Sequence, residues 1–438
     1  MTPDLEQFTP LARAHPRMEF HSLMGLVFRP EGLLDSFRRL PGNKAAGVDG
    51  MKKGDYAGGL EERIAELSAR LRRLGYRPHP VRRVYIPKAH SGRRPLGIPA
   101  FEDRIVQDRL SKILQAIWEP EFCDCSFGFR PGRSAHDALR RVNDIVMQPR
   151  TNYVVEADIK GFFTHVDHGW MPRFLQHRIT DPRFVRLLHR FLRGGVMEDG
   201  VVQASEEGTP QGGLVSPVLS NVYLHYVLDL WFERWLVKRC RGKAFLVRYC
   251  DDFVALFERE EDACWFLEEL PKRLAPFALE IEPSKTQMLP FGVYQRRQKP
   301  TSFTQPSTFT FLGFTHYMGR SRRGQPLLGR TTERHRMQRK LKEAKERLKS
   351  LRTQGTNAMV DYAVRHVRGH LQYYGVSGNA RSIVRYGWLL RGLLFKWLNR
   401  RSQKRSLTWE KYRRLLDARK WPKPRIVHPL YDTSNRPT

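Results

Sequence analysis

The sequence predicts an α+β fold that is followed by a basic, helical C-terminal region. Between residues 102 and 118, apolar side chains recur at the spacing of an amphipathic helix. Short, mainly apolar runs at 153–157, 245–249 and 253–257 are instead typical of buried β-strands. Beyond about residue 320, helical patterns rich in Lys and Arg dominate. Because 438 residues exceed what one compact core usually holds, we expect two or three packed subdomains.

The N-terminal part of the chain combines turns, helices and one basic strand. A turn-rich stretch at residues 41–50 precedes a helical apolar pattern at 64–74. A basic strand interrupted by proline follows at residues 82–88. After the helix at 102–118, Ser134 with Asp137 predicts the start of another helix.

Acidic residues stand at the ends of the predicted strands. The run at 153–157 delivers Asp158 before Gly161 breaks the pattern, and the two later runs are separated by Cys250-Asp251-Asp252. The second arrangement predicts a hairpin with acids at its tip. Carboxylates are costly to bring together unless a cation neutralises them, and magnesium is the favoured candidate. Taken alone, Tyr-x-Asp-Asp also fits an ordinary surface turn.

The charge balance favours a polyanionic partner. The chain carries 77 Lys and Arg against 45 Asp and Glu, a net charge of +32 at pH 7. Nucleic acid is favoured over a membrane surface, because no apolar stretch is long enough to span a bilayer and the N-terminus lacks the apolar core of a secretory signal. Five cysteines without CxxC spacing indicate a reducing compartment and ordinary thiols rather than a zinc site.

Cations also dominate the segment that follows the predicted strands. Between Ser321 and Thr353, Lys and Arg clearly outnumber glutamate, and Arg330 is among the cations. A solvated helix face usually mixes charge signs, so this imbalance favours a surface that faces a polyanion. We expect a domain boundary near residues 320–330.

Eight short motifs make these patterns more specific, because they occur in a fixed order along the chain. They are Gly47–Gly50, Ile86–Lys88 with Arg93–Pro99, Phe127–Pro131, Ala157–Phe163, Gly208–Gly213, Arg248–Asp252, Glu282–Thr286 and Phe311–Phe314. The series resembles the sequence blocks of group II intron reverse transcriptases over roughly Leu23 to His316. The remainder, with Gly369–Gly375 and Trp397–Ser402, resembles the maturase or thumb domain of the same family.

The resemblance implies a right-hand polymerase, in which fingers and palm combine an antiparallel sheet with helices and precede an α-helical thumb. The chain is divided accordingly into an N-terminal extension over 1–45, reverse transcriptase fingers and palm over 46–320, and a basic, helical thumb or maturase domain over 321–438.

Metal-binding and catalytic residues are also implied by the resemblance. Asp158 and Asp251 would bind two Mg²⁺ ions, with Ile159 as a further metal ligand. Asp252 would be the third catalytic residue and would support the turn, since neighbouring side chains on a strand point to opposite faces. Two such ions can activate a primer 3′-hydroxyl and stabilise the leaving pyrophosphate.

Five further residues match substrate-binding positions of the family. Lys88 and Arg94 correspond to cations that meet the incoming triphosphate, and the alternative is a basic surface that touches template phosphates. Phe162 corresponds to an aromatic gate beneath the deoxyribose, with plain core packing as its alternative. Gln211 corresponds to the residue beside the nascent base pair, and is otherwise a turn glutamine. Lys285 fits a cation near the phosphates of the palm, or a lysine at a helix boundary.

Aromatic and basic residues mix in the C-terminal region, where they could pack a helical bundle or stack on RNA. For Trp388 and Trp397 we favour core packing. The chain departs from the family at Cys250, where most members have alanine beside the primer terminus. It also ends soon after Pro424–His428 without a His- and Cys-rich endonuclease segment, so target cleavage is not expected.

The implied function is RNA-directed DNA polymerisation by a mobile-element protein of the bacterial cytoplasm or nucleoid. Its partners would be an RNA template, intron RNA whose splicing it assists, a DNA or RNA primer, and dNTPs. We expect no membrane association, and the protein would be a monomer or a homodimer. One alternative is a splicing cofactor, or maturase, with incidental polymerase activity. Another is a host-adopted reverse transcriptase in DNA repair or defence, which Cys250 and the missing endonuclease segment would suit.

Overall fold

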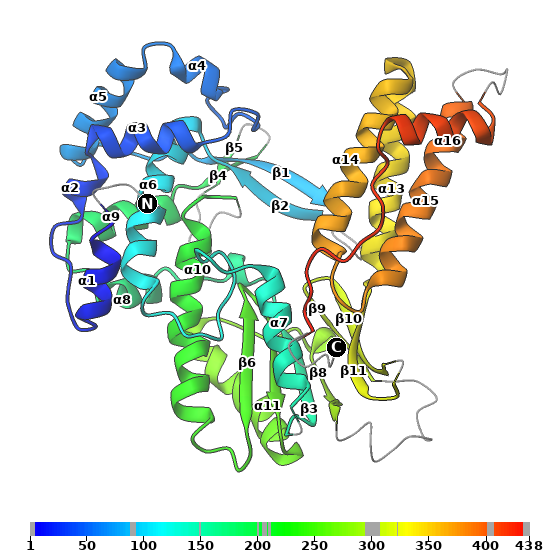
Figure 1. The fold of residues 1–438 in the computed structure, drawn as a ribbon. Coiled ribbons are helices and arrows are strands. Elements are labelled where there is room, and N and C mark those ends of the chain that lie inside the picture. Colours follow the sequence, from blue (N-terminus) through cyan, green and yellow to red (C-terminus); the bar gives the residue numbers. More distant parts are fainter. Residues whose placement is uncertain are drawn as a thin grey trace. The chain divides into compact units, whose positions relative to one another are not determined.

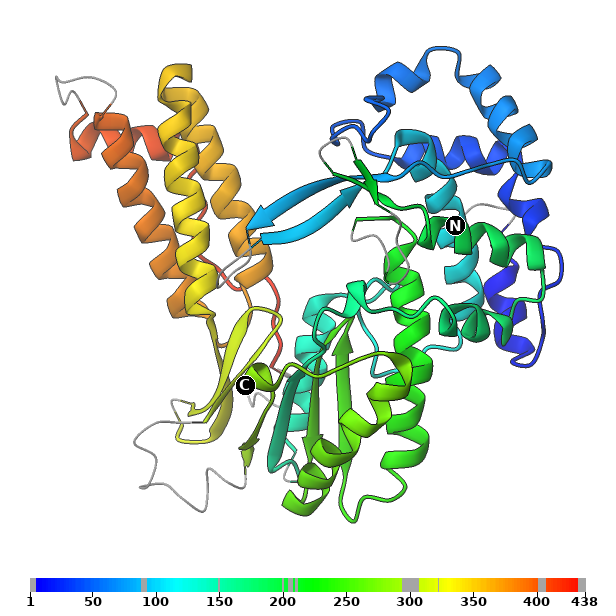
Figure 2. The ribbon, with the colours of Figure 1, turned by 180° about the vertical axis from the view of Figure 1, so that it is seen from behind.

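The computed structural model of the chain describes residues 5–87, 93–148, 150–198, 201–203, 208, 212–293, 307–321, 323–400 and 407–431. Two compact units divide the chain, and neither is continuous in sequence. Unit 1 comprises Met1–Ala135, Ala157–Ala255 and Glu261–Gln287, and unit 2 comprises His136–Glu156, Leu256–Glu260 and Met288–Thr438. Figures 1 and 2 show the elements of both units from opposite sides.

Unit 1 is mainly helical, with α6 (Phe101–Trp118) at its centre. Ile105, Leu110 and Ile117 of α6 are all fully buried, so this helix confirms the one predicted over 102–118. The remaining helices and helical turns are α1 (Phe8–Ala14), α2 (Met24–Val27), α3 (Pro30–Arg39), α4 (Lys53–Ala57), α5 (Leu60–Arg72), η2 (Phe162–Thr164), α8 (Trp170–Gln176), α9 (Pro182–Leu192), α10 (Ser216–Leu224), η3 (His225–Asp229), η4 (Phe232–Leu236), α11 (Glu260–Leu274), η5 (Ala275–Phe277) and η6 (Pro283–Lys285).

A four-stranded sheet in unit 1 has the order β2-β1-β4-β5. Its strands are β1 (Val81–Pro87), β2 (Arg93–Ile98), β4 (Val196–Glu198) and β5 (Val201–Gln203). β1 and β2 are antiparallel with Arg82 opposite Ile98 and Ile86 opposite Arg94, whereas β1 and β4 run parallel. The basic strand predicted at 82–88 is therefore confirmed as far as Pro87.

A second four-stranded sheet carries the acidic motifs and has the order β6-β7-β3-β8. Its strands are β6 (Ala244–Tyr249), β7 (Asp252–Phe257), β3 (Tyr153–Asp158) and β8 (Gln287–Pro290), and the division between the units passes through β3, β7 and β8. Val154 and Val155 of β3 and Val254 and Ala255 of β7 are fully buried, which explains why these runs are mainly apolar. The predicted strands and the predicted hairpin are confirmed.

Unit 2 combines an antiparallel sheet of order β11-β10-β9 with a bundle of helices. The strands are β9 (Thr308–Phe311), β10 (Phe314–Arg320) and β11 (Pro326–Thr332), and the helices and helical turns are α7 (Ala135–Val146), α13 (Arg334–Ser350), η7 (Leu351–Gln354), α14 (Thr356–Tyr374), α15 (Ala380–Asn399) and α16 (Trp409–Ala418). Helices α13, α14 and α15 pack side by side (Figures 1 and 2). Among the described residues, no helix has both the length and the apolar content that crossing a bilayer requires.

The structure corrects two expectations about the basic C-terminal region. Helices were expected from about residue 320, but Pro326–Thr332 forms β11 because it pairs along its whole length with β10. Arg330 was counted among cations that face a polyanion, but it is fully buried and its Nη2 donates to Asn143 Oδ1 at 3.2 Å. Burial lowers the pKa of Arg330 to about 10. Arg330 therefore does not contribute to a surface of exposed cations.

Candidate active site

Asp158 is the last residue of β3, and the local backbone fixes its position. The next residue, Ile159, is buried and forms an isolated bridge with Ile281. The backbone carbonyl of Asp158 accepts a hydrogen bond from the Glu282 amide at 2.8 Å. Its side chain nevertheless remains 34% exposed, so the backbone is held in place while the acidic group is accessible.

Asp251 and Asp252 lie at the tip of the β6–β7 hairpin, as predicted. β6 ends at Tyr249 and β7 begins at Asp252, so the chain reverses over Cys250 and Asp251. Cys250 has a φ of +61°, in the left-handed region that a turn this tight requires. Both acidic residues are partly exposed. The turn therefore presents carboxylates at the end of a buried hairpin.

The sheet order brings Asp158 to this hairpin tip. β3 and β7 are neighbours, and the Asn152 amide just before β3 donates to the carbonyl of Phe257, the last residue of β7, at 2.9 Å. β3 thus starts where β7 ends, so the two strands run antiparallel. Asp158 consequently lies beside the start of β7, where Asp251 is found.

Lys285 joins the two carboxylates electrostatically. Its Nζ forms an ion pair with Asp158 Oδ2. The hydrogen bond to Asp158 raises the pKa of Lys285, and the negative charges of Asp158, Glu282 and Asp251 raise it further. Together with the strand order, the ion pair places Asp158, Asp251 and Lys285 at the same end of the sheet, where they form one charged cluster. The ammonium group remains well exposed to solvent.

The donor atoms of this cluster fit magnesium. Asp158 and Asp251 offer carboxylate oxygens, and Ile159 could contribute only its backbone carbonyl oxygen. Within the described part of the chain, no three His, Cys, Asp or Glu side chains come together as a complete metal cage. Mg²⁺ usually binds through one or two carboxylates and completes its shell with water and substrate phosphates. An oxygen-only donor set at an exposed strand end suits that behaviour.

Three predicted substrate-binding residues are described incompletely or not at all. Lys88 and Gln211 lie outside the described residues. Arg94 belongs to β2, where its backbone pairs with Ile86 of β1. Their roles stay predictions.

Phe162 is held in the core of unit 1. It is 1% exposed and begins the turn η2 directly after Asp158–Gly161. Its ring centroid lies 5.3 Å from that of Phe163 and 6.3 Å from that of Tyr223. This packing agrees with the core alternative, and the gate role stays a prediction.

The side chains that hold the β6–β7 hairpin in place were not predicted from the sequence. Arg248, on the strand that leads to the turn, is fully buried and contacts Asp229, Asn221 and Ser126. The available signal was an arginine inside the otherwise apolar run at 245–249, because buried cations need partners. The partners themselves come from distant segments that carry no such signal.

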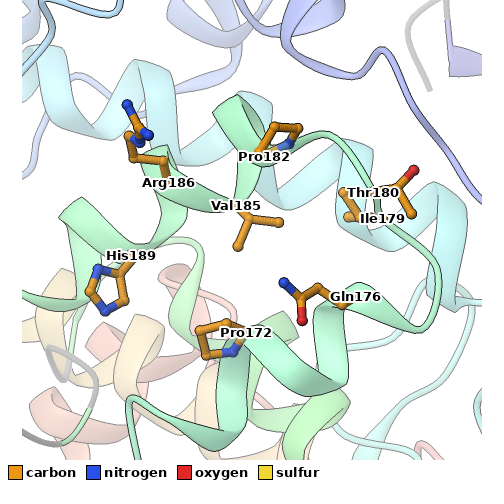
Figure 3. Close-up of a pocket in the computed structure, with 8 residues that line it drawn as sticks. All are labelled: Pro172, Gln176, Ile179, Thr180, Pro182, Val185, Arg186 and His189. Atoms are coloured by element: carbon orange, nitrogen blue, oxygen red, sulfur yellow. The ribbon is translucent and has the colours of Figure 1, made fainter.

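A surface pocket of about 470 Å³ lies elsewhere in unit 1, between helices α8 and α9 (Figure 3). Its lining is mainly apolar, with Pro172 and Val185 facing it from the two helices, together with Arg186 and His189. Burial lowers the pKa of His189, and the positive charge of Arg193 adds to the effect. The pocket shares no residue with the charged cluster and is not part of the candidate site.

Comparison with known proteins gives consistent matches. A sequence model of the family described as "Reverse transcriptase (RNA-dependent DNA polymerase)" matches residues 86–316. Protein YkfC of Escherichia coli (strain K12) is 37% identical over 236 residues, which cover 52% of this chain and 62% of YkfC. The group II intron-encoded protein LtrA of Lactococcus lactis subsp. cremoris is 39% identical over 216 residues, which cover 48% of this chain and 36% of LtrA.

A more distant match comes from Arabidopsis thaliana. Its mitochondrial nuclear intron maturase 1 is 30% identical over 100 residues, which cover 22% of this chain and 13% of the maturase. The chain therefore spans less than two thirds of the length of each of these relatives.

Proposed function

The chain belongs to the reverse transcriptase (RNA-dependent DNA polymerase) family, and on this premise we propose that it extends a primer on an RNA template by two-metal nucleotidyl transfer. Group II intron-encoded proteins and intron maturases are among its relatives. The observation that carries the proposal is the cluster of Asp158, Asp251 and Lys285 at the ends of β3 and the β6–β7 hairpin.

The residues of the cluster suit the chemistry of nucleotidyl transfer. Asp158, Asp251 and the carbonyl oxygen of Ile159 would hold two Mg²⁺ ions. When bound, such ions supply Lewis-acid activation of the primer 3′-hydroxyl and neutralise charge on the triphosphate. Lys285 reduces the repulsion between the two carboxylates, and its exposed ammonium can turn to a substrate phosphate. Asp252 supports the turn from the opposite face of the strand.

The substrate would be bound and selected by residues around this cluster. Lys88 and Arg94 would bind the triphosphate, and Gln211 would pack beside the nascent base pair. By its place in the motif, Phe162 would lie beneath the deoxyribose and exclude a 2′-hydroxyl. These roles rest on the match of the residues to the family motifs.

Helix α15 supports nucleic-acid binding by the C-terminal region. Trp388 is 72% exposed, so the core packing expected for it is wrong, whereas Trp397 is buried as expected. Exposed Arg381 and Arg385 lie on the same helix face as Trp388, and α15 contains no acidic residue. An exposed indole on the same face as two guanidinium groups suits base stacking and phosphate binding. The division into an N-terminal extension over 1–45, fingers and palm over 46–320, and a thumb over 321–438 is proposed from the order of the family motifs.

A second function, assistance of intron RNA splicing, is favoured by the maturase and group II intron proteins among the relatives. The partner would then be intron RNA, and the basic face of α15 would suit it as well as a template. A third candidate function, which Cys250 would suit, is a host-adopted role without an intron.

Primer extension tests the proposed polymerase activity. The purified protein is given an RNA template, an annealed DNA primer, dNTPs and Mg²⁺. Asp251→Asn is compared with Glu268→Gln, which removes the same charge at an exposed position on α11. We expect extension by the wild type and by Glu268→Gln, and a loss of about a thousandfold in Asp251→Asn, because metal-bound carboxylates contribute several kcal/mol. Undiminished extension by Asp251→Asn would refute the proposal.

The same variant separates the two functions. If Asp251→Asn loses extension but still promotes splicing of an added intron RNA, splicing assistance is independent of polymerisation. If splicing is promoted by neither protein, the maturase role is rejected and the polymerase alone remains.

A further inference from the structure

Arg248 belongs to the motif Arg248–Asp252, but the proposed function gives its side chain no role. It is fully buried in unit 1. Its guanidinium forms a bidentate ion pair with Asp229, with Nε donating to Oδ1 at 2.7 Å and Nη2 donating to Oδ2 at 2.5 Å. Neither side chain is exposed to solvent. Desolvation of a buried ion pair is costly, so excellent geometry and further hydrogen bonds must offset it.

The other N–H groups of the guanidinium are bonded as well. Nη1 donates to Asn221 Oδ1 at 3.1 Å and to the Cys250 carbonyl at 3.0 Å, and Nη2 donates to Ser126 Oγ at 2.9 Å. Every N–H of the guanidinium therefore has an acceptor. Because its donors form a planar, rigid fork, one group fixes the relative positions of three segments: the loop at Ser126, the helical run from α10 to η3, and the turn at Cys250.

The bond to the Cys250 carbonyl acts on the peptide group that precedes Asp251. Cys250 is in the left-handed conformation with φ of +61°, which costs an L-residue about 1 kcal/mol. Its carbonyl group and the Asp251 nitrogen belong to one planar peptide unit. Holding the carbonyl oxygen therefore fixes the plane from which the Asp251 side chain projects.

The segment at Phe127 and Gly128 packs closely against the same turn. A Cβ at Gly128 would lie 2.5 Å from the Cys250 nitrogen, so only glycine allows this approach. The Gly128 carbonyl accepts a hydrogen bond from Asn221 Nδ2 at 2.6 Å, and the Phe127 amide donates to the Arg248 carbonyl at 2.8 Å. Asn221 thus bonds both to Arg248 and to the segment that packs on the turn.

We propose that Arg248, oriented by Asp229, is a positioning residue for nucleotidyl transfer. It holds the peptide between Cys250 and Asp251 in the orientation that directs the Asp251 carboxylate to the metal ions. The inference rests on the proposed function of Asp251. Apolar side chains of similar volume would stabilise this core about as well as a buried ion pair, but they could not bind the carbonyl oxygen. The network therefore serves orientation rather than stability alone.

Arg248→Lys tests the inference, because lysine keeps the charge and lacks the fork. The matched control is Arg109→Lys: Arg109 is also fully buried in unit 1, and it donates to the Leu26 carbonyl at 2.9 Å. Mn²⁺ binding to the protein alone is measured by electron paramagnetic resonance, and kcat and KM for dNTP are measured by primer extension. Thermal unfolding compares the stability of the two variants.

We expect Arg248→Lys to weaken Mn²⁺ binding and to lower kcat by about 10- to 100-fold each, the usual effect of removing a residue that orients a metal ligand. KM for dNTP should hardly change. Arg109→Lys should match the wild type in Mn²⁺ affinity and kcat, even if its melting temperature falls as much as that of Arg248→Lys. A double variant, Arg248→Met with Asp229→Leu, removes the ion pair without leaving a buried charge, and should show the same losses while remaining folded.

Equal Mn²⁺ affinity and kcat in the Arg248 and Arg109 variants would overturn the positioning role, and so would failure of both Arg248 variants to fold. In either case the proposed function still stands if the wild type extends a primer and Asp251→Asn does not. If the wild type and Asp251→Asn do not differ in extension, the proposed function itself is wrong.

Discussion

Cys250 shows how single residues shape the turn that carries Asp251. Its side chain is 4% exposed, and burial together with the neighbouring Asp251 charge raises the pKa of the thiol. The thiol therefore stays protonated at neutral pH and adds no charge beside the carboxylate. The buried side chain leaves little room for a larger residue at this position. Cys250 meets this size limit much as alanine would.

Thiol reactivity should differ sharply between cysteines for the same reason. Cys123 is only half-buried, and the hydrogen bond from Cys125, together with His225 Nδ1 at 3.9 Å from its Sγ, lowers its pKa. The native protein treated with iodoacetamide at pH 6 should be alkylated at Cys123 faster than free N-acetylcysteine, and not at Cys250, because the thiolate is the nucleophile. Peptide mass spectrometry gives the sites. Alkylation of Cys250 at the rate of Cys123 would contradict this description of the turn.

The residues of the site were predictable from sequence to different degrees. Asp158 and Asp251 could be found because acids at the ends of apolar runs are unusual and because ordered motifs surround them. Ser126, Asn221 and Asp229 could not be found, since they lie far from the acidic motifs in sequence and gain their role only by meeting Arg248. Partner choice of this kind depends on tertiary packing, which local patterns do not encode.

At the level of secondary-structure elements, helices α14 and α15 are joined by stacked imidazole and phenol rings. The His370 ring stacks on Tyr386, with ring centroids 3.5 Å apart and planes 7° apart. His366 Nε2 lies 2.6 Å from the Tyr386 hydroxyl oxygen. Burial lowers the pKa of His370 to about 3, and the positive charges of His366 and Lys340 contribute. The packing of the two helices therefore requires a neutral His370.

Acid should consequently destabilise this pair of helices. In the unfolded chain His370 gains a proton as the pH falls through 6.5, whereas the folded protein keeps it neutral until about pH 3. Stability is then lost between these two values, by about 2 kcal/mol at pH 5. Urea unfolding at pH 7 and pH 5 measures the loss. His370→Phe should reduce it by about that amount, and His335→Phe at an exposed position should not. An unchanged pH dependence in His370→Phe would exclude this explanation.

Element prediction succeeded where local periodicity decides the structure. α6 follows from its apolar spacing and the β6–β7 hairpin from two buried runs around a short turn. β11 was missed because its Arg330 suggested a continuing basic surface. Its strand conformation comes from pairing with β10, and the burial of Arg330 comes from partners in other segments.

For the whole molecule, the excess of positive charge and the family motifs predicted the class of function better than they predicted the domain boundaries. The proposed regions are continuous in sequence, whereas both compact units are assembled from separate stretches and divide β3, β7 and β8 between them. The division of these strands between two units cannot be predicted from composition, because each strand has the sequence pattern of an ordinary, mainly apolar strand. The net charge of +32 supports nucleic-acid binding but does not locate it.

Locating the metal ions is the most direct test of the proposed mechanism. Crystals of the protein with an RNA template, a DNA primer and a non-hydrolysable dNTP analogue, soaked in Mn²⁺, would reveal the ions by anomalous scattering. We predict ions bound to the carboxylates of Asp158 and Asp251 and to the Ile159 carbonyl, with Lys285 moved from Asp158 to a phosphate oxygen. Mn²⁺ found only elsewhere, with Lys285 still paired to Asp158, would contradict the two-metal site.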